Sequence, residues 1–198
     1  AQGCRLPYSL LENDKTIDKG YLLSPKDLCL IEYIPQLIDA GIDSFKVEGR
    51  TKSTYYASCV AKTYRAAIDE YMQKGTFDKD FYKNELWKVR NRGYTTGFFL
   101  DKSQKGNYTY AKEPSDIGNT FCVQILGKEN QGYKGLIKNN VDIQEIYEFI
   151  SPKDQFQTKL TKIITEYGEE VERATTNDIV YLSFEREPVE FSHSLLRK

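Results

Sequence analysis

Apolar positions in the first 75 residues alternate between short continuous runs and longer segments with a helical repeat. The runs at 20–23 and 42–47 predict short buried strands. Helix start signals follow both runs, with a Ser-Pro pair at 24–25 and a Ser-Thr pair at 53–54. The pattern therefore predicts strand, helix, strand, helix, which is typical of a parallel α/β arrangement.

Proline and glycine positions set the expected helix ends. The first helix should break near Ile34, because Pro35 follows, and should end at Gly41. The second helix should run to about Lys74 and stop at Gly75. Its expected apolar face consists of Tyr56, Val60, Tyr64, Ala67, Ile68 and Tyr71.

Two such strand–helix units cannot close a barrel, since a complete eight-unit barrel takes about 250 residues. Either the units pack as an unusual small layer, or they are the C-terminal piece of something longer. We favour the second interpretation. The segments at 24–27 and 48–52 both follow a predicted strand. In α/β folds, ligands bind at the carboxyl ends of the strands. The two positions would lie side by side if the strands are neighbours.

Beyond this region the periodicity changes twice. Residues 76–116 are expected to be a connecting region, with a short helix at 81–89 and a loop or short extended stretch at 93–99. Basic and aromatic residues mix there, so the region either contacts nucleic acid or is a solvated linker. From 117 to 198 the apolar positions repeat every two residues, which predicts a small antiparallel β-barrel. The expected strands are 121–126, 133–137, 145–150, 156–164 and 179–184.

Composition and charge narrow the class of protein. The 198 residues carry a net charge of −1 and a pI near 6.0, so no overall basic field indicates nucleic-acid binding. No apolar run reaches the roughly 20 residues of a membrane helix, and no signal peptide opens the chain. We expect a cytoplasmic protein, processed or cut at its N-terminus and without membrane contact. The four cysteines are scattered, which favours reduced thiols.

Charged residues gather between the second predicted strand and its helix. Glu48 is a candidate general acid or base, or it orients Arg50. Arg50 and Lys52 could hold a carboxylate or phosphate beside the helix N-terminus. The alternative is a structural ion pair across the strand-to-helix turn. Asp27 is a helix cap or a second substrate contact. Arg65 could lie close to the same charged residues and also contact the substrate.

Several ordered motifs resemble one known family. They are Cys4-Arg5 with Tyr8, the segment from Gly20 to Leu28, the segment from Phe45 to Lys52, Tyr64-Arg65, and the segment from Tyr94 to Phe98. This set is similar to the collagenase-like peptidase family of unclassified mechanism, which includes prephenate-dependent tRNA uridine hydroxylases. The likeness spans nearly all of the chain and is weaker from about Ile117. One departure is Asn91, where family members often have histidine.

The resemblance implies a fold, a cofactor and site residues. The first part would hold the last units of a TIM-like barrel, and the last part a small C-terminal β-barrel. Family members carry a cysteine-ligated iron–sulfur cluster, and Cys4 matches one ligand. Its partners would lie outside this chain, so we expect no cluster on this chain alone. The likeness strengthens Glu48 as a catalytic residue, and Arg50 and Lys52 as substrate-binding residues.

Three functions compete. The chain is part of an enzyme that hydroxylates tRNA using an anionic small molecule such as prephenate, or it belongs to a protease, or its barrel binds RNA or a protein. The single histidine, His193, lies in a polar tail, so no serine or cysteine protease triad can be built. An incomplete barrel would expose apolar strands and edges, so we also expect homo-oligomers or a packing that covers them.

Overall fold

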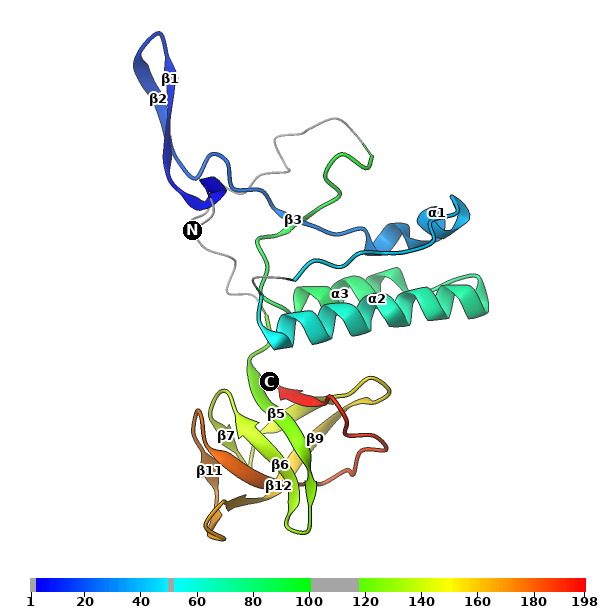
Figure 1. Cartoon of the computed structure of the whole chain (residues 1–198), viewed down its shortest axis with the longest axis vertical. Helices are drawn as coiled ribbons and strands as arrows, with labels where there is room; N and C mark the ends of the chain where they lie inside the picture. The colour runs from blue at the N-terminus through cyan, green and yellow to red at the C-terminus, as the bar shows by residue number, and fades with distance from the viewer. Residues whose placement is uncertain (1–2, 50–51, 101–117) are drawn as a thin grey trace. The chain divides into compact units, whose positions relative to one another are not determined.

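The computed structural model describes residues 3–49, 52–100 and 118–198. The chain divides into two compact units, Ala1–Gly118 and Asn119–Lys198 (Figure 1). In its described residues, the first unit contains short strands, two short 3-10 turns and three α-helices. Its elements are η1 (Gly3–Arg5), β1 (Tyr8–Glu12), β2 (Lys15–Gly20), β3 (Asp27–Leu28), η2 (Ile31–Tyr33), α1 (Ile34–Asp39), α2 (Thr54–Lys74), α3 (Lys79–Trp87) and β4 (Tyr94–Thr95).

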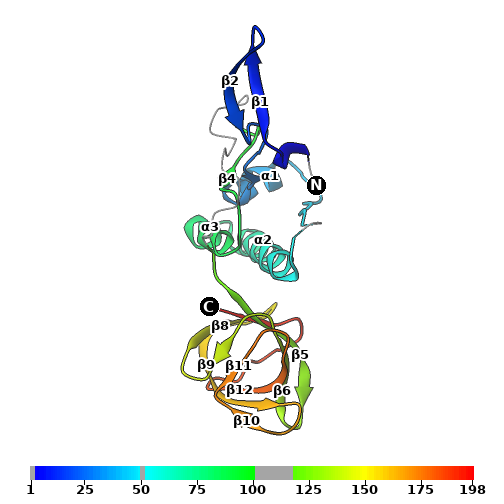
Figure 2. The ribbon, with the colours of Figure 1, turned by 90° about the vertical axis from the view of Figure 1, so that its left-hand side faces the viewer.

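The long helix α2 confirms its predicted boundaries. The Ser53 side chain accepts a hydrogen bond from the Tyr56 amide, and Gly75 ends the helix in a left-handed conformation with φ of 70°. Helix α3 lies beside α2 (Figure 2), and the Tyr55 hydroxyl donates to the Lys88 carbonyl just beyond α3. The side of α2 that carries Tyr55, Cys59, Thr63 and Ala67 is buried. The expected apolar face was therefore only partly right.

Three predictions for residues 20–47 were wrong. The predicted strand at 20–23 does not form. The strand in this part of the chain is β2, which ends at Gly20 and forms an exposed hairpin with β1. The Ser-Pro pair at 24–25 does not start a helix: the Asp27 and Cys29 amides donate to the Gly93 and Thr95 carbonyls, at 2.9 Å each. Pairing with a distant strand thus overrides the local cap signal, and the helical turns begin only at Ile31.

The third of these errors concerns the predicted strand at 42–47. This segment is not paired with any strand in the described part of the chain. A strand needs a neighbour to satisfy its backbone groups, and none of the described residues supplies one. Ile42 and Val47 are consequently 46% and 42% exposed.

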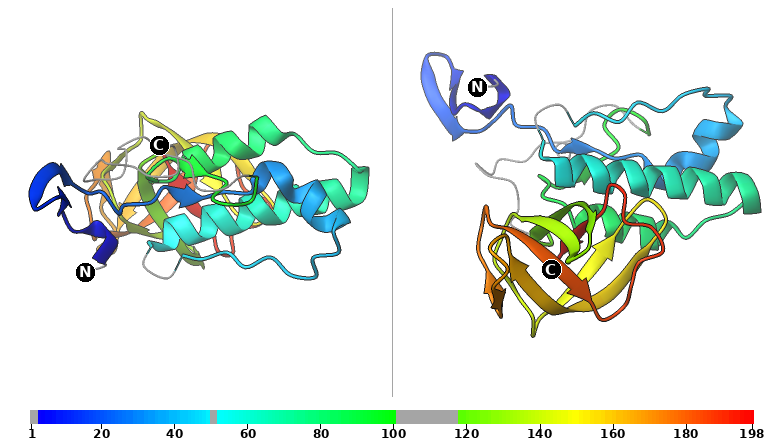
Figure 3. Two further views of the ribbon diagram at one scale, coloured as in Figure 1. Left: turned by 90° about the horizontal axis from the view of Figure 1, so that it is seen from above. Right: turned by 60° about the horizontal axis from the view of Figure 1, so that its bottom comes forward.

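The second unit is built from antiparallel strands. They are β5 (Phe121–Glu129), β6 (Gly132–Ile137), β7 (Val141–Asp142), β8 (Ile146–Ile150), β9 (Gln155–Thr165), β10 (Glu170–Val171), β11 (Arg173–Ala174), β12 (Ile179–Phe184) and β13 (Leu195–Arg197). Six of them close a barrel in the order β9, β12, β6, β5, β13, β8, with β8 pairing back onto β9 (Figure 3). This confirms the predicted small β-barrel.

Alternating side chains of the barrel strands fill its interior. Tyr147, Phe149, Ile163 and Leu182 are fully buried in this core. Close packing requires Gly135, because a Cβ atom there would lie 2.8 Å from Val123 Cγ1. Arg197 on β13 is also buried, and its Nε donates to Glu148 on β8 at 2.8 Å. The shortest barrel strand is thus held by an ion pair as well as by its ladder.

Candidate functional site

The first unit encloses a cavity of about 590 Å³. Its walls come from the unpaired segment that follows α1, from β3, and from one side of α2. The lining residues are Asp27, Leu28, Leu30, Leu37, Ile42, Ser44, Phe45, Lys46, Val47, Glu48, Gly49, Lys52, Tyr56, Val60, Tyr64 and Arg92. One end of this set is charged and the rest is largely apolar. A small molecule with a charged group and an apolar body would match such a surface.

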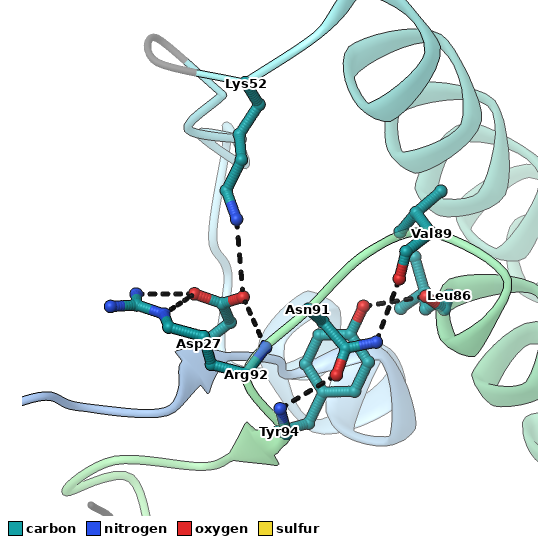
Figure 4. A network of polar contacts seen from close by, with 8 residues as sticks. Asp27, Lys52, Leu86, Val89, Asn91, Arg92 and Tyr94 are labelled. Carbon is teal, nitrogen blue, oxygen red and sulfur yellow. Dashed lines mark hydrogen bonds and ion pairs between the residues drawn. The ribbon is translucent and has the colours of Figure 1, made fainter. Parts of the chain in front are cut away.

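The charged end is a cluster around Asp27 (Figure 4). Asp27 Oδ1 accepts hydrogen bonds from Arg92 Nη2 at 2.7 Å and from Nε at 3.2 Å. Asp27 Oδ2 accepts from the Arg92 amide at 3.2 Å and lies 3.5 Å from Lys52 Nζ. The three side chains are mostly buried, with exposed fractions of 11% for Asp27, 15% for Arg92 and 23% for Lys52. One carboxylate thus lies between two cations.

Local backbone geometry places Arg92 at this cluster. The buried Asn91 side chain donates to the Val89 carbonyl at 2.9 Å and accepts from the Gly93 amide at 2.8 Å, which closes a tight turn. Gly93 has φ of 80°, in the left-handed region. The Tyr94 hydroxyl then anchors β4 by donating to the Leu86 carbonyl at 2.7 Å. Parallel pairing of β3 with β4 brings Asp27 opposite Tyr94 and so next to Arg92.

Arg92 has one donor group left over. The Nη1 atom is buried and has no hydrogen-bond partner among the described residues. The other guanidinium nitrogens are used by Asp27, as Figure 4 shows. A guanidinium group carries five N–H donors and no acceptor, so the donors of Nη1 are unused among the described residues.

The apolar wall on α2 carries two tyrosines. Burial raises the pKa of the Tyr56 phenol, and the negative charge of Asp27 raises it further. Lys52 Nζ lies 4.7 Å from the centre of the Tyr56 ring. The Tyr64 hydroxyl accepts from the Leu30 amide at 3.1 Å and lies 3.6 Å from Cys29 Sγ, and burial raises the pKa of both side chains. Both phenols therefore stay protonated near neutral pH.

The structure brings together some of the residues predicted for the site. Asp27, Glu48 and Lys52 all line the cavity, and Glu48 is exposed. Arg50 lies outside the described residues. Arg65 does not line the cavity; it forms an ion pair with Asp69 on the exposed side of α2. Asp27 is a residue of β3 and not the helix cap that the sequence suggested.

Arg92 was not predicted as a site residue, although its position in a basic and aromatic region was noted. The partner of Arg92 is Asp27, which lies 65 positions earlier in the chain. Only the β3–β4 pairing joins the two, and both strands are two residues long. The one local sign in the sequence is the Asn-Arg-Gly turn, which lies directly before the Tyr94-Thr95 strand and places Arg92 at a strand end.

Metal ligation has no support from the described residues. No three His, Cys, Asp or Glu side chains converge in the parts of the chain that the structure describes. Cys4 is a free, half-buried thiol in η1. These residues alone do not fit an iron–sulfur cluster, which takes about four ligands. In the same parts of the chain, no helix combines the length and apolar character that crossing a membrane requires.

Comparison with known proteins adds a family relationship. Residues 1–109 match the family model of peptidase family U32. An uncharacterized protease of Methanocaldococcus jannaschii is 44% identical over 140 residues, 67% of this chain and 34% of the relative. The tRNA hydroxylation protein P of Haemophilus influenzae is 32% identical over 158 residues, 78% of this chain and 34% of the relative. The chain thus spans about a third of the length of these relatives.

One solved structure resembles part of the chain. It is the C-terminal domain of a Geobacillus thermoleovorans protein assigned to the U32 peptidases. The match has 23% sequence identity and a TM-score of 0.35, and it covers 40% of this chain and 99% of that domain.

Proposed function

The chain belongs to peptidase family U32, and on that premise we propose that it is part of an enzyme that hydroxylates tRNA. In this proposal the cavity of the first unit binds an anionic small molecule, such as prephenate, that the reaction requires. The relative from Haemophilus influenzae, named for tRNA hydroxylation, supports the reaction class.

The observation that carries this proposal is the cluster of Asp27, Lys52 and Arg92 at one end of the cavity. Two mostly buried cations against one carboxylate leave a net positive charge beside an apolar wall. Charges in such a setting are screened less than on the surface, so an anion is attracted strongly. A compact acid with an unsaturated ring would place its carboxylate on the cations and its ring on Tyr56 and Tyr64.

Glu48 is the proton-transfer residue in this proposal. It lines the cavity and is exposed, and among the described residues it has no hydrogen bond or ion pair. A carboxylate is a suitable group for general acid–base chemistry in such a position. Lys52 would hold the anion. Arg50, which lies outside the described residues, stays a predicted substrate contact.

We also propose that the first unit contributes the last strands of a TIM-like barrel. Two features support this. Strands β3 and β4 pair in parallel, and the extended segment 42–49 has apolar side chains but no strand partner in the described chain. Strands from outside this sequence would pair with that segment and complete the cavity wall.

An iron–sulfur cluster would be held mostly by residues outside this sequence, with Cys4 as one ligand. The described residues alone do not form such a site. In the full-length protein, Cys4→Ser should lower the iron content and the visible absorbance. Unchanged iron content would remove Cys4 as a ligand.

Nucleoside analysis of cellular tRNA tests the proposed function. Cells in which the gene is deleted should lose a hydroxylated uridine, and the wild-type gene should restore it. Glu48→Gln and Lys52→Gln should restore less than a tenth of it. Lys74→Gln is the matched control, because Lys74 pairs with Glu70 on an exposed part of α2. Unchanged tRNA in the deletion strain would contradict the proposal.

A protease is the second candidate, supported by the family's name and by the relative from Methanocaldococcus jannaschii. His193, the single histidine, belongs to the second unit and does not line the cavity. Purified full-length protein should cleave denatured collagen if this candidate holds. Cleavage that persists in Glu48→Gln and Lys52→Gln would point to a contaminating protease or to another site.

A further inference from the structure

The hairpin of β1 and β2 is exposed along almost its whole length. Every residue of β1 and every residue of β2 up to Lys19 is exposed. Among the described strands the two pair only with each other, and Figure 2 shows the hairpin extending away from α2 and α3. A two-stranded hairpin alone is at best marginally stable in water, whereas three or more strands with an apolar face are stable. We therefore expect the hairpin to gain strands from another surface.

The two free edges of this hairpin differ in character. Strand β2 carries Lys15, Asp18 and Lys19, and it has a bulge at Ile17, which no β1 residue opposes. Charged side chains and bulges are features that keep an edge strand from pairing with another chain. Strand β1 reads Tyr-Ser-Leu-Leu-Glu, with a single charge at its last residue. The edge of β1 is therefore the one that can accept a further strand.

The sequence of β1 fits an antiparallel pairing with its own copy. In such a two-fold pairing one residue lies opposite itself, and only a centre at Leu10 pairs all five residues of the strand. Tyr8 then faces Glu12 of the second copy, and Ser9 faces Leu11. No like charges meet, and Leu10, which is 48% exposed in the single chain, contacts the same leucine across the axis.

Strand β2 does not fit a pairing of the same kind. With the axis at Ile17, Lys15 would lie opposite Lys19 of the second copy, and this repulsion would occur twice. With the axis at Asp18, two aspartates would face each other. Like charges directly opposite one another destabilise a strand pair. The hairpin thus has one edge that is compatible with its own copy and one that opposes it.

We propose that a second copy of this chain binds at β1. The two β1 strands pair antiparallel about a two-fold axis at Leu10, which joins the two hairpins into one four-stranded sheet. Leu10 and its copy meet on one face of this sheet, and Leu11 packs beside Ser9 of the second copy on the other. This contact is separate from the cavity and from the proposed reaction.

Sedimentation velocity of the full-length protein tests this pairing with charged variants. Leu10→Glu and Leu10→Lys each place like charges on the two-fold axis, so each should raise the dimer dissociation constant by about ten-fold or more. An equimolar mixture of the two variants should restore the dimer, because glutamate then faces lysine. Lys19→Glu, on the other strand of the same hairpin, is the matched control and should leave the dissociation constant unchanged.

Cross-linking keeps the test valid if a charge at this position disturbs the hairpin itself. Leu10→Cys in the full-length protein should form a disulfide-linked dimer on mild oxidation, because directly opposite residues of paired strands lie within reach of a disulfide. Lys19→Cys should not, since β2 lies on the far side of the hairpin from the second copy. The wild-type protein with its native thiols is the blank for both variants.

Three results would overturn the proposal. They are a full-length wild type that sediments as a monomer, Leu10→Glu and Leu10→Lys variants that remain dimers, and a mixture of the two that stays monomeric. In the last case the hairpin packs against a different surface, on the second copy or within the full-length chain. None of these measurements involves tRNA, so a failure of this proposal and a failure of the proposed function are distinguishable.

Discussion

At the scale of single residues, Asp27 is the centre of the site. Its carboxylate accepts three hydrogen bonds from Arg92 and lies 3.5 Å from Lys52 Nζ. All three side chains are mostly buried, so neither cation can turn fully to water when the carboxylate is removed. The cluster therefore contributes to stability as well as to recognition, and the two effects can be separated experimentally.

Asp27→Ala should destabilise the first unit by about 3 kcal/mol, because it leaves two cations mostly buried and unpaired. Urea unfolding followed by tryptophan fluorescence measures this, since the only tryptophan, Trp87, belongs to the same unit. Asp69→Ala is the control: it breaks an exposed pair with Arg65 and should cost less than about 1 kcal/mol. Similar losses in the two variants would contradict the role of burial.

Glu70 links α2 to α3 and makes stability depend on pH. Hydrogen bonds from Lys74 at 2.9 Å and Tyr82 at 2.8 Å lower the pKa of Glu70. A lowered pKa means that the stabilisation is fully present above the unfolded value of about 4.5 and is lost as the pH falls through the folded value.

Glu70→Gln should therefore reduce the loss of stability between pH 6 and pH 3, measured as the shift in the urea midpoint of Trp87 fluorescence. The pKa of Tyr82, raised to about 12 by burial and by Glu70, should fall in the same variant. If the variant and the wild type lose the same stability over this pH range, Glu70 is not the titrating group.

At the scale of elements, sequence patterns predicted what depends on neighbours in the chain. Helix α2 has a cap, a long amphipathic repeat and a terminal glycine, and its boundaries were right. The barrel strands have a clear period of two. In contrast, β3 and β4 are two residues long and form only because they pair with each other. No local pattern shows that these two strands pair, so the Asn-Arg-Gly turn alone does not join Arg92 to Asp27.

Gly135 in β6 makes the packing of the barrel testable. Gly135→Ala should destabilise the barrel by about 1 to 3 kcal/mol, because its Cβ would overlap Val123 and press on Leu182 at 3.1 Å. Gly127→Ala in β5 is the control, since a Cβ there meets nothing within 4 Å. Hydrogen exchange of residues 119–198 reports on this unit directly. Equal protection in both variants would show that the core adapts without cost.

At the scale of the whole molecule, the first unit exposes many large apolar side chains. Large side chains from the β1–β2 hairpin and from the unpaired segment are about half exposed. They include Leu10, Leu11, Ile17, Ile42 and Val47. Singly exposed apolar residues are ordinary, but runs of them along unpaired strands usually mark a contact surface.

The 198-residue chain alone should therefore associate at micromolar concentration. Sedimentation velocity should show species larger than 22.9 kDa for the whole chain. Leu11→Lys combined with Val47→Lys should shift the distribution toward the monomer, whereas Tyr167→Lys, at an exposed turn of the barrel, should not. A wild-type chain that sediments as a monomer would contradict this expectation.

The way the barrel closes has a consequence for how it can be joined to other proteins. Thr120 and Lys198 exchange two backbone hydrogen bonds, at 2.8 and 3.0 Å, so the unit's two ends lie side by side. When the two ends of a unit adjoin, the two points at which a host chain joins it lie close together. The unit could be inserted into a surface loop of an unrelated host protein without separating the two ends of that loop. Its own two ends could also be joined and the chain opened at the Asn139-Asn140 turn, which would keep the topology.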